Sequence, residues 1–352
     1  MRRTQGLLDL QVNGYAGVDF NDAALTPDAL DHALHAMLRA GVTRCLPTLI
    51  TAAEATLAAR LHALDHAIRT SRLGPLMVPG LHLEGPFLNP APGYAGCHPA
   101  AAMGPPDPAL LTRVLSGIQT PLRLLTLAPE RPDAMALIAW AKARGIVTAM
   151  GHTAADHDTV RQATEAGLTL STHLGNALPQ PQPKFFNPLM AQLAEDRLSA
   201  SFIADGIHIP AHALKVLLRA KGMERCILVT DATAAADAPP GLYAFAGMRI
   251  EHAVDGSVRE PKGAMGGTVL AGSALRLDQA VRNVVAWGFA SVETAIAMAS
   301  AHPAALLGLS DDGAVVEWDD ALVPRRVTVG EISVAHPARH ADAPPLPFAE
   351  NR

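Results

Sequence analysis

The chain contains four residues that together can bind a metal ion and move a proton. Each lies at the end of a short apolar segment, and they are Glu84, His152, His173 and Asp231. Two imidazoles and one carboxylate can hold a divalent cation while a further position stays open for water. A second carboxylate can then act as general base. This chemistry requires that the fold bring all four side chains to one place.

Each of these residues also has a simpler interpretation when it is taken alone. A histidine at the end of a strand is more often a hydrogen-bonded structural group than a ligand. Glu84 alone can compensate a helix dipole, and Asp231 alone can cap a helix. The four together favour a metal site, because each buried polar group needs a partner.

Short apolar segments alternate along the chain with amphipathic, alanine-rich ones, which is typical of a parallel sheet with intervening helices. We expect eight strands, at 7–12, 42–47, 77–83, 122–127, 146–150, 168–172, 199–204 and 227–230. Helices are expected between them at 27–40, 52–70, 133–144, 156–166 and 211–220. This order predicts an α/β fold, a (β/α)8 TIM-like barrel. A doubly wound sheet fits less well, since no glycine-rich phosphate loop follows the first strand.

In such a barrel the carboxyl ends of the strands share one face, where active sites are built. Gln11 and Asn13 end the first strand and point the same way at a period of two. His98 lies on the loop after the third strand, and His208 follows the seventh. We expect these four side chains on the same face. His82, inside the third strand, is interpreted as structural.

After the eighth strand, residues 243–259 predict a β-hairpin with Asp255-Gly256 as its turn. Three further helical patterns are expected to follow and to close the barrel, at 273–287, 292–301 and 303–307. The end of the chain is rich in Pro, Ala and His, and we expect it to be flexible.

Composition narrows the class of protein. The 352 residues carry a formal net charge of −5, which argues against a nucleic-acid-binding surface. No apolar run is long enough for a signal peptide or a transmembrane helix, so we expect no membrane partner. The three cysteines cannot all pair, which favours a reducing compartment, and we expect a cytoplasmic protein.

Nine segments occur in a characteristic order between residues 8 and 309. They are LDLQVNGYAGVDF (8–20), HLEGPFLN (82–89), TLAPE (126–130), GHT (151–153), THLGNAL (172–178), IADGIH (203–208), LVTDA (228–232), LAGSALRLDQAVRN (270–283) and MASAHPAALLGL (298–309). In this order they resemble the amidohydrolase superfamily, and most closely its N-acetylglucosamine-6-phosphate deacetylase branch. The resemblance implies a metal-dependent hydrolase that removes an acetyl group from the nitrogen of an amino sugar.

The resemblance also assigns roles at the reaction centre. Glu84, His152 and His173 match the metal ligands, and Asp231 matches the catalytic acid and base. His98 matches a histidine that contacts the substrate and steadies its carbonyl oxygen. We expect one divalent metal per subunit, with Zn²⁺ ahead of Fe²⁺, Mn²⁺ and Co²⁺.

Further positions match groups that bind the substrate. His208 matches a histidine that contacts the sugar, and Asn176 and Ala177 match the place where backbone amides approach the phosphate. Gln11 and Asn13 match branch members that have lost a pair of histidine ligands, which is why a single metal is expected.

The loop at 178–188 departs from the branch. It lacks the arginine that grips the substrate phosphate there, and it offers Lys184 and two adjacent phenylalanines instead. A lysine lacks the bidentate fork that suits phosphate. We therefore expect a substrate that is non-phosphorylated or differently substituted.

The ends of the chain also differ from the branch, whose members usually begin with part of a small β-sandwich. We expect this domain to be largely missing, and apolar surface left uncovered to be buried in a homodimer. The predicted units are a barrel at 7–310 that includes the hairpin, a remnant of the small β domain at 311–335 and a flexible tail at 336–352.

Two other functions remain open at this point. The enzyme class can be the same and the substrate another small amide, such as an N-acyl amino acid or a cyclic amide. The chain can also be a non-catalytic binding protein on a hydrolase barrel, since a fold does not fix a function.

Overall fold

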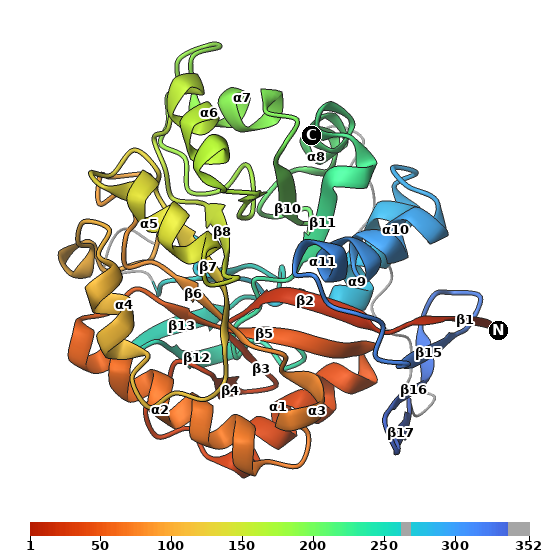
Figure 1. Cartoon of the computed structure of the whole chain (residues 1–352). Helices are drawn as coiled ribbons and strands as arrows, with labels where there is room; N and C mark the ends of the chain where they lie inside the picture. Colours follow the sequence, from red (N-terminus) through yellow and green to blue (C-terminus); the bar gives the residue numbers. More distant parts are fainter. Residues whose placement is uncertain (262–268, 337–352) are drawn as a thin grey trace.

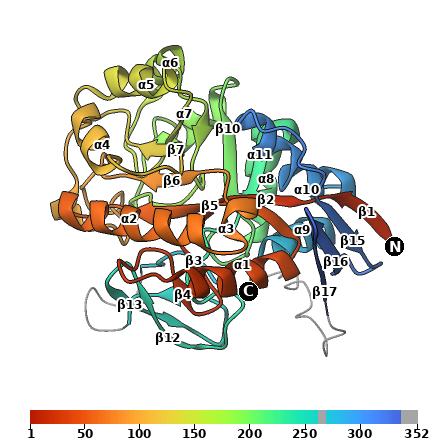
Figure 2. The ribbon, with the colours of Figure 1, turned by 60° about the horizontal axis from the view of Figure 1, so that its bottom comes forward.

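The computed structural model describes residues 1–261 and 269–336. Eight parallel strands form one sheet that curls into a barrel, with helices around the outside (Figures 1 and 2). In the order of the sheet, the strands are β11 (Cys226–Val229), β10 (Ser199–Ile203), β9 (Leu170–Ser171), β8 (Val147–Met150), β7 (Leu122–Leu127), β6 (Leu81–Glu84), β5 (Val42–Ile50) and β2 (Leu7–Val12). A parallel bridge between Val12 and Ala232 brings the two edges together. The predicted (β/α)8 barrel is confirmed.

The helices outside the barrel include three that were not predicted from the sequence. They are α1 (Pro27–Arg39), α2 (Glu54–Thr70), α3 (Gly74–Met77), α4 (Pro108–Val114), α5 (Ala134–Lys142), α6 (His157–Ala166), α7 (Pro188–Ala194), α8 (Ala211–Lys221), α9 (Leu277–Ala286), α10 (Val292–Met298) and α11 (Ala301–Leu306), with 3₁₀ turns η1 (Ala100–Ala102) and η2 (Met223–Arg225). The first of them, α3, ends where the strand expected at 77–83 was to begin, and that strand, β6, starts at Leu81 instead. The other two, α4 and α7, each have an N-cap side chain followed by proline, Asp107-Pro108 and Asn187-Pro188. That pair is a helix start signal as well as a loop signal.

The barrel strands are buried on both faces of the sheet. All six residues of β2 and all nine of β5 are buried, as expected for parallel strands covered by helices on one side and filled inside on the other. The polar members of β2 are therefore costly unless they are hydrogen-bonded. Asp9 accepts bonds from the backbone N–H and the hydroxyl of Thr230 in the strand-end segment across the seam.

The region after the eighth strand forms a three-stranded sheet of β12 (Gly241–Phe245), β13 (Met248–His252) and β14 (Val258–Arg259). The expected single hairpin with its turn at Asp255-Gly256 is therefore wrong in part. That turn joins β13 to β14, whereas β12 and β13 turn at Ala246-Gly247, both with positive φ. Alanine rarely takes this conformation, so a turn at Ala246 is not expected from the residue types.

A second, four-stranded antiparallel sheet lies beside the barrel near the N-terminus (Figures 1 and 2). It consists of β1 (Arg2–Gln5), β15 (Val315–Trp318), β16 (Pro324–Val329) and β17 (Ile332–Ala335). The sequence predicts a β remnant at 311–335 but not the contribution of β1. A short ribbon of β3 (Gly14–Tyr15) and β4 (Val18–Asp19) completes the strands. Of the predicted tail at 336–352, all but His336 lies outside the described residues.

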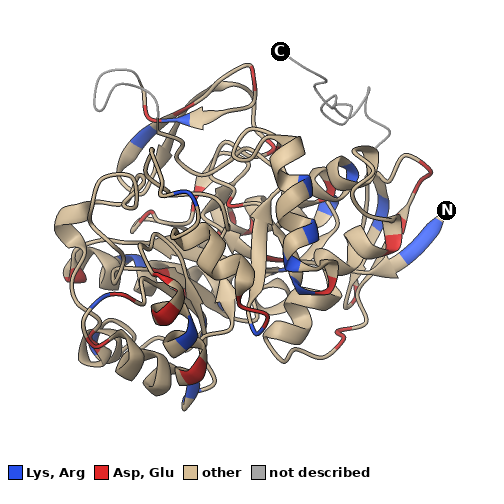
Figure 3. Cartoon of the chain, turned by 90° about the horizontal axis from the view of Figure 1, so that it is seen from above, with Lys and Arg blue, Asp and Glu red and all other residues tan. Residues whose placement is uncertain are grey.

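The outer surface carries both signs of charge. Lys and Arg are interspersed with Asp and Glu around the periphery of the ribbon (Figure 3). Among the described residues, no helix is both long and apolar enough to cross a membrane. The domain boundaries expected from the sequence stay a prediction.

Substitution of Trp318 tests whether the small sheet contributes to the stability of the barrel core. Its side chain is fully buried, and its indole N–H donates to Thr4 Oγ1 at 2.8 Å. We expect Trp318→Ala to lower the free energy of unfolding by about 3–5 kcal/mol. Arg326→Ala, on an exposed position of β16, should change it by less than about 0.5 kcal/mol. Chemical denaturation measures the free energy of unfolding of both variants. A small loss of stability in Trp318→Ala would mean that the sheet does not share a core with the barrel.

Candidate active site

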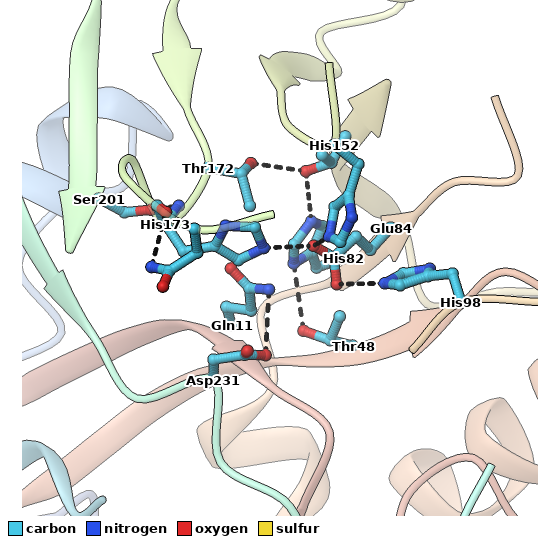
Figure 4. A network of polar contacts seen from close by, with 12 residues as sticks. Gln11, Thr48, His82, Glu84, His98, His152, Thr172, His173, Ser201 and Asp231 are labelled. Atoms are coloured by element: carbon cyan, nitrogen blue, oxygen red, sulfur yellow. Dashed lines mark hydrogen bonds and ion pairs between the residues drawn. The ribbon is translucent and has the colours of Figure 1, made fainter. Parts of the chain in front are cut away.

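Two imidazoles from the carboxyl ends of the strands meet at one carboxylate (Figure 4). Glu84 is the last residue of β6, and His152 and His173 follow β8 and β9. His173 Nε2 lies 2.9 Å from Glu84 Oε1, and His152 Nε2 lies 3.3 Å from the same oxygen. All three side chains are buried. The three predicted metal ligands are therefore brought together.

His98 joins this cluster from the long loop after β6. Its Nε2 lies 3.6 Å from Glu84 Oε2, and its ring centroid is 4.5 Å from that of His152. Ligand atoms of Glu84, His98 and His152 all lie within 4.8 Å of one another. His98 is predicted to contact the substrate, and the structure puts it beside the predicted ligands, where it can also reach a cation.

Hydrogen bonds at Nδ1 of His152 and of His98 determine which way the Nε2 lone pair of each ring points. His152 Nδ1 lies 2.7 Å from the carbonyl oxygen of Tyr94, so it must be the protonated nitrogen. Thr51 donates its hydroxyl to the carbonyl of Glu84 and therefore accepts from His98 Nδ1 at 3.0 Å. When neutral, both rings turn an Nε2 lone pair toward the oxygens of Glu84.

A cation is what such an arrangement needs. Burial opposes ionisation of Glu84, but hydrogen bonds donated by N–H groups of His152, His173 and His98 outweigh burial and hold its pKa well below the usual value. Where the Nε2 atoms of His98 and His152 carry lone pairs instead of protons, a cation must replace those donors, because the carboxylate and the lone pairs repel each other. Neutral imidazoles and a carboxylate suit Zn²⁺, Fe²⁺, Mn²⁺ or Co²⁺. The donor set therefore fits a divalent metal.

The backbone at these residues is strained. His152, His173 and Asp231 have φ values of 52°, 31° and 51°, in the left-handed region that residues with a Cβ rarely adopt. Each such conformation costs roughly 1–3 kcal/mol and persists only where its surroundings enforce it. Three members of one cluster share this feature, which is typical of functional sites.

Asp231 follows β11 and is fixed by amide side chains from the first strand. Gln11 Nε2 and Asn13 Nδ2 both donate to its Oδ1, at 3.1 and 2.7 Å. Within the described part of the chain, no hydrogen bond reaches Oδ2, which is left to accept a proton. Burial raises the pKa of Asp231 to about 6, and the charge of Glu84 adds to the rise.

A cavity of about 910 Å³ opens over the cluster. Glu84, His98, His152, His173 and Asp231 all line it, and so do four of the predicted substrate-binding residues, Asn13, His208, Asn176 and Ala177. Gln11 and Lys184 are not among the lining residues. Gln11 is buried behind Asp231, whereas Lys184 is exposed on its loop. Their predicted contacts with substrate stay predictions.

His208 lies at the cavity, as its position after the seventh strand predicts, and His82 lies inside the barrel beneath the cluster. His208 Nδ1 lies 2.6 Å from Asp205 Oδ2, so its other nitrogen is available to the cavity. His82 lies beneath the cluster, with Nδ1 at 3.1 Å from Thr48 Oγ1 and Nε2 at 2.8 Å from Thr126 Oγ1. Both of its nitrogens are satisfied, in keeping with a structural residue.

Sequence reasoning assigned no role to Glu130, which ties two loops of the site together. Its carboxylate accepts bonds from Asn89 Nδ2, from the hydroxyl of Thr153 and from the backbone N–H of Ala154. It thereby links the loop after Glu84 to the turn that carries His152. The signal was present, since Glu130 follows the fourth strand in the segment TLAPE.

Comparisons with known proteins agree with this geometry. The chain is 36% identical over 304 residues to an N-acetylgalactosamine-6-phosphate deacetylase of Escherichia coli O157:H7, covering 86% of this chain and 77% of the relative. It is 31% identical to the N-acetylglucosamine-6-phosphate deacetylase of Bacillus subtilis, covering 90% of this chain and 78% of the relative. A search of protein-family models gave no match.

The chain belongs to the N-acetylglucosamine-6-phosphate deacetylase family.

Solved structures of this family share the fold. A mutant N-acetyl-D-glucosamine-6-phosphate deacetylase of Mycobacterium smegmatis, in complex with N-acetyl-D-glucosamine-6-phosphate, superposes with a TM-score of 0.83 at 30% identity. The match covers 93% of this chain and 85% of that one. The family is part of the amidohydrolase superfamily, as the sequence motifs indicated, and its members are hydrolases of carbon–nitrogen bonds other than peptide bonds.

His152 provides a test of the metal centre. We expect His152→Ala to weaken the affinity for Zn²⁺ by at least about a hundredfold, because even the loss of a group that only orients a ligand costs tenfold to a hundredfold. His66→Ala removes an exposed histidine from α2 and should leave the affinity unchanged. Competition with a chromogenic chelator measures both. Wild-type affinity in His152→Ala would exclude this residue as a ligand.

Proposed function

We propose that this chain is a metal-dependent deacetylase that hydrolyses the acetamide of an N-acetyl amino sugar. The observation that carries the proposal is the pairing of the buried Glu84 cluster with Asp231, a carboxylate with one oxygen left to accept a proton. Curated relatives at 30–36% identity named as amino-sugar deacetylases support the reaction.

The roles of the residues follow from their positions. Glu84, His152 and His173 would hold the cation, which supplies Lewis-acid chemistry by polarising an amide carbonyl and lowering the pKa of water. Asp231 Oδ2 takes a proton from the attacking water while Gln11 and Asn13 keep Oδ1 in place. The same oxygen then returns the proton to the departing nitrogen of the sugar.

Groups around the cavity orient the substrate. His208 offers a nitrogen to a sugar hydroxyl, because its other nitrogen is held by Asp205. Asn176 and Ala177 lie on the loop that follows His173 and line the same cavity. The contact of His98 with the substrate carbonyl requires a second proton on its ring, against burial and the neighbouring His152, which lower its pKa. That contact stays a prediction.

Three finer properties belong to the same proposal. We take Zn²⁺ as the native metal, since imidazole and carboxylate ligands in a buried, open site are typical of catalytic zinc. Three free cysteines, Cys45, Cys97 and Cys226, support a cytoplasmic location. A homodimer is proposed as the assembly, supported by the exposed apolar side chains of Phe185 and Phe186.

Substitution of Asp231 separates proton transfer from metal binding. We expect Asp231→Asn to keep its metal and to lower kcat for acetate release from N-acetylglucosamine by about 10²–10⁴-fold. Asp320→Asn, at an exposed position, should match the wild type. Acetate release and elemental analysis are measured on the same samples. A metal-loaded Asp231→Asn with wild-type kcat would rule out the base, and a wild type inactive on every N-acetyl sugar would rule out the function.

The pH dependence of the reaction tests the same group. Asp231 must be ionised to act as base, so kcat/KM should fall as the pH drops through its pKa. Burial and Glu84 place that pKa at about 6, and a cation on Glu84 opposes the second effect. We therefore expect an acidic limb at or below about pH 6. The residual activity of Asp231→Asn should lack this limb, and an unchanged limb in the variant would assign it to another group.

A further inference from the structure

Glu130 accepts hydrogen bonds from three donors that come from two different loops of the site. Its Oε1 accepts from Asn89 Nδ2 at 2.8 Å and from the backbone N–H of Ala154 at 2.7 Å. Its other oxygen accepts from the hydroxyl of Thr153. Hydrogen bonds to a carboxylate are stronger than those between neutral groups. The carboxylate therefore fastens the turn after His152 to the loop after β6.

In the turn, these bonds restrain the backbone that directly follows a predicted metal ligand. Thr153 and Ala154 are the two residues after His152, and the Thr153 hydroxyl also accepts from the backbone N–H of Ala155 at 3.0 Å. His152 itself has a φ of 52°, which is unfavourable for a residue with a Cβ. A strained backbone of this kind persists only where its surroundings hold it. The bonds to Glu130 hold the chain on the C-terminal side of the strained residue.

In the loop, Asn89 extends the restraint to the ring of His152. The backbone N–H of Asn89 donates to the carbonyl oxygen of His152 at 3.1 Å, and its side-chain oxygen accepts from the backbone N–H of Ala91 at 2.9 Å. The backbone N–H of Tyr94 donates to the carbonyl oxygen of Ala91 at 3.1 Å. The carbonyl oxygen of Tyr94 then lies 2.7 Å from His152 Nδ1 and accepts its proton. One chain of hydrogen bonds thus runs from Glu130 through the loop to the imidazole.

We infer that Glu130 is a positioning residue for the metal centre, which holds His152 by its backbone and by its ring so that Nε2 faces Glu84. This assignment rests on the metal site of the proposed function. His152 Nε2 lies 3.3 Å from Glu84 Oε1, whereas Glu130 is not among the described residues that line the cavity. Glu130 therefore acts on the metal through hydrogen bonds and the ligand they orient, as groups behind metal ligands commonly do.

Variants at Glu130 separate the effect of its hydrogen bonds from that of its charge. Glu130→Ala removes both acceptor oxygens. Glu130→Gln keeps one oxygen for the two N–H donors and offers an N–H to the Thr153 hydroxyl. Glu195→Ala is the matched control, because this half-buried glutamate at the end of α7 also accepts from a backbone N–H and a side chain, both of Arg197. The measured quantities are the Zn²⁺ affinity, by competition with a chromogenic chelator, and the unfolding temperature of each metal-free full chain.

We expect Glu130→Ala to weaken the Zn²⁺ affinity by about tenfold to a hundredfold, the usual cost of losing a group that orients a ligand. Glu130→Gln should stay within about threefold of the wild type, because it keeps the hydrogen bonds. Glu195→Ala should lower the unfolding temperature and leave the affinity unchanged. Wild-type affinity in Glu130→Ala overturns the assignment. Equal losses in Glu130→Ala and Glu130→Gln, or in Glu130→Ala and Glu195→Ala, also overturn it, since they point to charge or to general destabilisation.

A second pair of variants tests the same role if Glu130→Ala does not fold. Thr153→Val removes one of the three bonds to Glu130, and Thr153→Ser keeps it. We expect Thr153→Val to weaken the Zn²⁺ affinity by about threefold to tenfold, as for one lost hydrogen bond, and Thr153→Ser to match the wild type. Equal affinities in these two variants overturn the role of Glu130 alone. A wild type that binds no Zn²⁺ overturns the metal centre, and with it the proposed function and this assignment.

Discussion

The site depends on one electrostatic constraint, a buried carboxylate faced by imidazole lone pairs. Glu84 stays ionised in the interior, and the hydrogen bonds of His98 and His152 to Thr51 and Tyr94 turn their other nitrogens toward it. When neutral, neither of these two rings has a proton left to donate at Nε2, so their lone pairs repel the carboxylate, whereas His173 can still donate to it from Nε2 at 2.9 Å. A cation bound between the carboxylate and the imidazole nitrogens removes this repulsion, and the loops around Glu84 place these ligands where they can bind one.

The barrel and most of the site could be predicted because the relevant rules are local. Apolar runs locate the strands, and a residue at the carboxyl end of a parallel strand must face the common end of the barrel. Glu84, His152, His173 and Asp231 all follow from this rule. The small sheet was harder to foresee, because β1 pairs with β15 from the other end of the chain and no local pattern encodes that contact.

Other features lay beyond sequence reasoning because they depend on how loops fold. The approach of His98 to Glu84 needs the course of a long loop, and spacing along the chain does not give it. The turn at Ala246-Gly247 uses an alanine where glycine or asparagine is expected. Glu130 could have been found, because it obeys the strand-end rule, but its role is to join two loops and not to face the cavity.

The left-handed backbone at His152, His173 and Asp231 has a consequence for how this sequence can vary. Glycine adopts that conformation without the penalty of about 1–2 kcal/mol that a Cβ imposes. If variants were selected for folding alone, glycine would be tolerated at these three positions, and only selection for chemistry would retain imidazole and carboxylate. A population of sequences that drifted free of function would therefore lose its reactive groups before it lost its barrel.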